Sequence, residues 1–149
     1  MVIKVKENFE LLEHIYQDSE MSCFSISDLL ERLKEKDNKI KKDLEDILHK
    51  YEYFKEKTYK ILKDNNQEIE KESSMVKWMA KTGIKKEVKS DNSDSSIADM
   101  LIKGISSGSI DMEKKISDYK DDVDKKYLDI AKDFLKFQED SIEALKKYL

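Results

Sequence analysis

Apolar and small residues recur along the first part of the chain at alternating intervals of three and four, which is the period of an amphipathic helix. The series keeps its phase across the polar stretch QDSE at 17–20, although that composition is typical of a loop. We therefore predict one uninterrupted helix over about residues 6–34. The series consists of Leu12, Ile15, Ser19, Cys23, Ile26, Leu30 and Leu33.

The same alternation predicts three more long helices and a short one. The long helices cover about residues 38–71, 96–118 and 122–148, and the short helix covers about residues 75–88. A cluster of turn-forming residues, SDNSDSS at 90–96, separates the short helix from the next long one.

Polar residues ahead of three of these helices predict where they begin. Asp37 is expected to cap the second long helix, and either Asp121 or Asp122 is expected to cap the last. Ser96 and Asp99 have the spacing of a capping box at the start of the third.

The lengths of the connections predict the topology. Only a few residues join the long helices within the first pair and within the second pair, so each pair must be an antiparallel hairpin. The longer connection between the pairs contains the short helix, which spans roughly 21 Å at the α-helical rise. We expect an all-α bundle in a single domain over residues 1–149, with two antiparallel hairpins joined by a long crossover.

Composition supports this fold and narrows the function. Of 149 residues, 42% are charged, three are glycine and none is proline, a balance that suits solvated helices. The net charge is -4 and Arg32 is the one arginine, so nucleic acid is not an expected partner. Abundant Lys, Ile and Asn are typical of an AT-rich bacterial genome. With no signal peptide and no apolar run of membrane-spanning length, we expect a cytoplasmic protein without a membrane span.

Two segments carry a resemblance to a known family. WMAKTGIK at 78–85 and SSIADMLIKGISSGSIDM at 95–112 resemble an uncharacterised ferritin-like four-helix family of spore-forming Gram-positive bacteria. The flanking helices fit the family more loosely along the whole chain. The resemblance implies a ferritin-like four-helix bundle of unknown function, and it implies no activity.

A ferritin-like fold raises the question of a di-metal centre, which needs Glu-x-x-His pairs on two helices. The residue three before His14 is Leu11, and the residue three before His49 is Asp46. In the predicted hairpin the two histidines differ in level by some 13 Å. We therefore interpret both as solvated and expect no metal or other cofactor, with Asp46, His49 and Asp111 as the weak metal candidates.

No enzyme motif is apparent. Cys23 lies on the apolar series and at the level of His49, but two ligands do not make a zinc site. A thiol in that position is more often a small core residue. Neither this thiol nor any serine is brought near a base and an orienting acid by the predicted spacing, so we expect a protein that is not an enzyme.

Two features remain as candidates for partner binding. Gly104 and Gly108 leave one side of their helix nearly flat, either for close packing or for a small ligand or second subunit. We expect close packing, and hence destabilisation by Gly104→Ala, and make no prediction of sign at Gly108. Trp78 and Met79 form an apolar turn that either covers the core or anchors a partner.

These features favour a non-enzymatic bundle that binds a partner or itself through the crossover and the glycine face. The alternative is a degenerate metal-binding bundle that uses Asp46, His49 and Asp111. A homo-oligomer or a protein partner is compatible with either function.

Overall fold

The computed structural model describes residues 5–70 and 74–149, with side chains from 6 to 70 and from 80 to 149. Throughout these residues the regular structure is α-helical, so the all-α prediction is confirmed. No described helix is long and apolar enough to cross a membrane. The helices are α1 (Val5–Leu33), α2 (Lys41–Asp64), α3 (Ser74–Ser90), α4 (Asp94–Tyr119) and α5 (Lys125–Lys146).

The first helix runs without a break through QDSE, as its apolar phase predicts. Ser19 is completely buried in this stretch although it is polar. The predicted end of the second helix is wrong, because α2 stops at Asp64 rather than near residue 71. Asn65 caps the last turn through its backbone N–H, and Asn66 has a φ of 58°, a left-handed conformation that asparagine tolerates.

The predicted capping box at the start of α4 is wrong. The N-cap is Ser93, whose hydroxyl oxygen accepts a hydrogen bond of 3.1 Å from the backbone N–H of Ser96. Asp99 lies inside the helix and forms an ion pair of 2.8 Å with Lys103 one turn later. The segment SDNSDSS at 90–96 contains several residues that can cap a helix. Where the preceding loop ends decides which of them is the cap.

The predicted caps of the second and last long helices are wrong as well. Ile40 precedes α2 and makes no side-chain cap, so Asp37 does not serve this role. Asp124 is the N-cap of α5, and Asp121 and Asp122 lie in the turn before it. A buried isoleucine at the α2 cap indicates that tertiary packing fixes this helix start.

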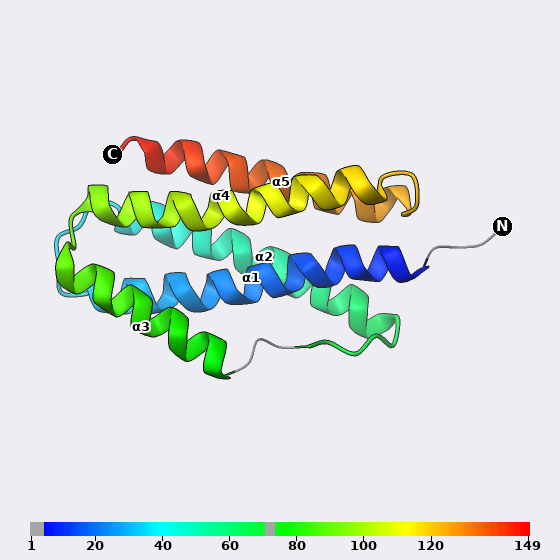
Figure 1. Ribbon diagram of the computed structural model, residues 1–149, viewed down its shortest axis with the longest axis horizontal. Coiled ribbons are helices and arrows are strands. Elements are labelled where there is room, and N and C mark those ends of the chain that lie inside the picture. Colours follow the sequence, from blue (N-terminus) through cyan, green and yellow to red (C-terminus); the bar gives the residue numbers. More distant parts are fainter. Residues whose placement is uncertain (1–4, 71–73) are drawn as a thin grey trace.

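Four of the helices pair as the short connections predict. α1 packs mainly on α2, and α4 packs mainly on α5, while further contacts of α1 with α4 and α5 and of α2 with α5 join the two pairs. α3 packs against α1 on the outside of these four helices, as Figure 1 shows. Four aromatic rings fill the core between α2 and α5, from Tyr51, Phe54, Phe134 and Phe137.

Side-chain hydrogen bonds tie the two pairs together at both ends of the bundle. At one end, the Oδ1 atom of Asn8 accepts a 2.8 Å bond from the backbone N–H of Asp124. At the other end, the side-chain amide of Asn38 donates to Asp94 at 2.9 Å and to the carbonyl of Asn92 at 2.8 Å. Each asparagine thus connects the first helix pair with the beginning of a helix in the second.

Asn8→Ala should lower the free energy of unfolding by about 1 kcal/mol, because it removes a buried partner from the first turn of α5. Urea denaturation of the purified variant measures the change. Asn92→Ala is the matched control, since Asn92 is exposed and uses only its backbone carbonyl in the contact with Asn38. An equal loss in both variants would contradict this role of Asn8.

Candidate binding pocket

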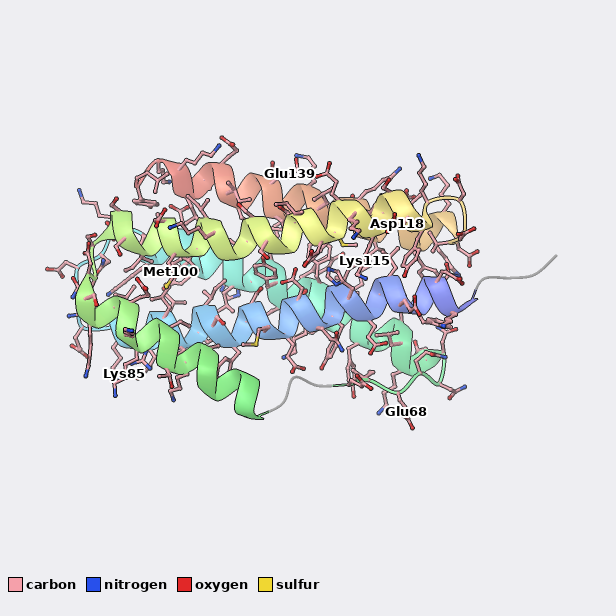
Figure 2. The ribbon with its side chains drawn as sticks, viewed as in Figure 1. Glu68, Lys85, Met100, Lys115, Asp118 and Glu139 are labelled. Carbon is pink, nitrogen blue, oxygen red and sulfur yellow. The ribbon has the colours of Figure 1, made fainter. Side chains whose placement is uncertain are left out.

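A hollow of about 520 Å³ lies between α1, α3 and α4. We call it the α3 pocket. Its volume is within the range of small-molecule sites. Met100 of α4 lines the pocket and lies in the space between α4 and α3 in Figure 2. The other large apolar residues around it are Met21, Ile26, Leu29, Ile84, Leu101 and Ile105.

Small residues keep the α3 pocket open. Ala80 and Gly83 of α3 line it from one side, and Gly104 of α4 lines it from another. A Cβ atom placed on Gly83 or on Gly104 meets no described atom within 4 Å. The expectation of close packing at Gly104 is therefore wrong, because the neighbouring helix leaves free space where that side chain would be.

The polar part of the α3 pocket centres on Asp18 of α1. Gln138 of α5 donates a 2.9 Å hydrogen bond from its Nε2 atom to one carboxyl oxygen, and the Ser22 hydroxyl donates a 3.1 Å bond to the other. Burial raises the pKa of Asp18, and these two hydrogen bonds offset the rise only in part. The nearby charge of Asp111 adds to the rise.

Tyr51 of α2 borders the same pocket and is completely buried. Ser22 and Gln138 lie close enough to its hydroxyl to lower its pKa as hydrogen-bond donors, but neither forms a hydrogen bond of ordinary distance and angle with it, and the Oε1 atom of Gln138 has no partner. Burial, and after it the charge of Asp18, raises the pKa of Tyr51. A buried polar atom without a hydrogen bond lowers the stability of the fold. Such an atom beside a hollow therefore indicates a position where a ligand can supply the missing bond.

At Gly108, α4 lies close to side chains of α1 and α5. A Cβ atom there would be 2.7 Å from a carboxyl oxygen of Asp18 and 3.0 Å from the Nε2 atom of Gln138. The two glycines of the flat face therefore differ. Gly108 lets the hydrogen-bonded Asp18 and Gln138 side chains fit under α4, and Gly104 opens the α3 pocket one turn earlier.

The weak metal candidates are not brought together. The side chain of His49 is 75% exposed, and Asp46 forms an ion pair with Lys42 on the same helix. Asp111 lies instead on α4, where its charge acts on His14 of α1. Within residues 5–70 and 74–149, no three histidine, cysteine, aspartate or glutamate side chains form a group suited to a metal ion.

The interpretation of the histidines is right for His49 and wrong for His14. His14 is half-buried, and its Nε2 atom has no hydrogen-bond partner. Burial lowers the pKa of His14, and the positive charge of Lys115 lowers it further. The core interpretation of Cys23 is confirmed, because the thiol is buried and burial raises its pKa to about 11.

A larger and more open hollow of about 920 Å³ lies between α1 and α2. Two of its carboxylates have partners, because Glu20 accepts a 2.7 Å hydrogen bond from Tyr16 and Asp28 forms a 2.8 Å ion pair with Arg32, whereas Glu56 is exposed. The α3 pocket is the stronger candidate, because its polar lining residues Asp18 and Tyr51 are largely buried among apolar walls.

Three polar residues of the α3 pocket region were not singled out from the sequence as site residues: Asp18, Ser22 and Gln138. One signal was available, because Gln138 occupies an apolar position of the last helix, where a buried amide requires a partner. The position of that partner, 120 residues earlier, could not be derived from helical periodicity.

The remaining partner-binding candidates, Trp78 and Met79, belong to α3, but their side chains lie outside the described residues. Comparison with protein-family models, with curated proteins and with solved structures finds no match. The function is therefore inferred from the geometry of the α3 pocket.

Proposed function

We propose that this protein is a non-enzymatic helical bundle that binds a small molecule with a largely apolar body in the α3 pocket. The observation that supports this function most is that Asp18 and Tyr51, whose buried hydroxyl makes no well-formed hydrogen bond, both line a hollow of about 520 Å³. Binding sites combine apolar walls with a few polar groups that fix the ligand.

The architecture around the pocket supports the same proposal. We infer a ferritin-like arrangement, in which α1 with α2 and α4 with α5 are the two hairpins and α3 belongs to the crossover between them. In this arrangement the crossover supplies one wall of the α3 pocket through Ala80, Gly83 and Ile84. A wall from outside the four-helix core leaves room for a ligand without hollowing the core itself.

Self-association through α3 and the glycine face remains a second form of the binding function, and analytical ultracentrifugation would test it.

The degenerate metal-binding bundle is not favoured by a specific observation, because its candidates Asp46 and His49 lie exposed on α2. Elemental analysis that found one or two irons per chain, lost in His49→Ala, would restore that alternative.

Gly104→Leu tests the proposed function directly, because the new side chain would extend into the free space of the α3 pocket. We expect the apolar fluorescent probe N-phenyl-1-naphthylamine to bind the wild-type chain and to bind this variant at least about tenfold more weakly, since a filled pocket must be cleared first. Fluorescence titration measures both affinities.

Gly104→Ala is the matched control, because one methyl group fills little of the pocket and should leave probe binding close to the wild-type value. Urea denaturation of both variants verifies that they are folded. Equal binding of the probe to wild type and Gly104→Leu, or no binding to the wild type, would contradict the proposed function.

A further inference from the structure

We propose that the ligand of the α3 pocket carries a positively charged amine and binds it through the carboxylate of Asp18 and the hydroxyl of Tyr51. This inference rests on the proposed function and specifies its ligand class as an organic cation with an apolar tail. The charges, the hydrogen-bonding capacity and the apolar walls of the pocket each support it.

The charge around the α3 pocket favours a cationic ligand. The charged residues that line the α3 pocket are Asp18, Lys86 and Glu87, and of these Lys86 and Glu87 are exposed on α3. Asp18 is largely buried, and no ion pair joins it to a cation within the described residues. Asp111 adds negative charge nearby. A cationic ligand group would compensate the buried carboxylate, whereas an anionic group would be repelled.

Asp18 and Tyr51 also have hydrogen-bonding capacity that the protein does not use. An ionised carboxylate offers about four acceptor positions, and Asp18 uses one on each oxygen, for Ser22 and for Gln138. Both oxygens can therefore accept another bond. Tyr51 lines the same pocket, and its buried hydroxyl makes no well-formed hydrogen bond. An ammonium group has three N–H donors and can use both residues at once.

The apolar walls of the α3 pocket favour a ligand with an apolar tail. The rest of the pocket wall is mainly methionine, leucine and isoleucine side chains from α1, α3 and α4. Such a wall gains free energy by covering an alkyl chain, roughly 0.8 kcal/mol for each buried CH₂ group. The pocket therefore matches a molecule that is cationic at one end and apolar along its length.

Three probes with the same tail separate the contributions of charge and tail: n-octylamine, n-octanol and n-octanoate. At pH 7 they are cationic, neutral and anionic. We expect octylamine to bind the wild-type chain about tenfold more tightly than octanol, because hydrogen bonds to a charged group are the stronger ones. Octanoate should bind most weakly. Displacement of N-phenyl-1-naphthylamine, checked by calorimetry, measures the three affinities.

Asp18→Asn should remove the preference, so that octylamine and octanol bind within about twofold of each other. The variant can keep its contact with Gln138, because rotating that amide presents the unpartnered Oε1 atom to the new NH₂ group. Glu87→Gln is the matched control, since it neutralises the other carboxylate of the pocket at its exposed rim. It should leave the preference intact.

Tyr51→Phe provides an independent variant if Asp18→Asn does not fold. It removes the hydroxyl and keeps the buried ring. We expect octylamine to bind it about threefold more weakly, with octanol nearly unchanged, because one hydrogen bond to the ammonium is lost.

Octanol or octanoate binding as tightly as octylamine in the wild type would overturn the inference and leave the proposed function standing. A preference for octylamine that survives Asp18→Asn and disappears in Glu87→Gln would also overturn it, because the amine would then lie at the rim. Failure of all three probes and of N-phenyl-1-naphthylamine to bind would overturn the proposed function as well.

Discussion

Phe134→Ala should lower the free energy of unfolding by about 3 to 5 kcal/mol, the range for removing a large buried aromatic side chain. Phe134 is 0% exposed and lies between the two helix pairs. Its ring centroid is 5.1 Å from that of Phe54, 5.9 Å from that of Tyr51 and 6.2 Å from that of Phe137. Removing the Phe134 ring leaves a cavity. The three neighbouring rings belong to two different helices and cannot all move into it.

Urea denaturation followed by circular dichroism measures this loss. Ile110→Ala is the control, because Ile110 is 65% exposed on α4 and its removal should change stability by no more than about 0.5 kcal/mol. A loss below about 1 kcal/mol in Phe134→Ala would mean that the aromatic cluster is not the centre of the core.

Gly108→Ala should lower the free energy of unfolding by about 1 to 2 kcal/mol. The new methyl group would approach the Asp18 carboxylate to 2.7 Å, which is too close for a carbon atom, so α4 or the carboxylate must move. Asp18 cannot move freely, because Gln138 and Ser22 both hold it. The gain in helix propensity, about 0.5 to 1 kcal/mol, offsets only part of this cost.

Gly104→Ala is the internal comparison and should raise the free energy of unfolding by about 0.5 to 1 kcal/mol, since the methyl group enters open space in a helix. This reverses the sign expected from the sequence. Measured urea midpoints that shift in the same direction for both glycines would contradict the structural difference between them.

The sequence predicts the helices well where a long apolar series exists. The phase from Leu12 to Leu33 was sufficient to override the loop-like composition of QDSE, because burying one continuous stripe outweighs local preference. Helix ends are predicted less well. Asn66 stops α2 through a left-handed backbone, and Ile40 starts it without a cap, and neither feature alters the apolar period.

The α3 pocket could not be derived from the sequence for a different reason. Gly104 and Gly108 look equivalent in a helical pattern, and only the residues opposite distinguish them. Those residues, Asp18 and Gln138, come from the first and last helices, so their hydrogen bond depends on the packing of the whole bundle. Periodicity places a side chain on a face of its own helix but does not specify its partner on another.

Because α3 lies outside the four long helices, one wall of the α3 pocket does not belong to the four-helix core. Among the side chains described in α3, Val88 is the one in the buried core, whereas Ala80, Gly83 and Ile84 form a wall of the pocket. Substitutions at these three positions change that wall while the aromatic residues of α2 and α5 stay the same. Evolution can therefore retune ligand preference in few steps while the stability of the bundle stays nearly constant.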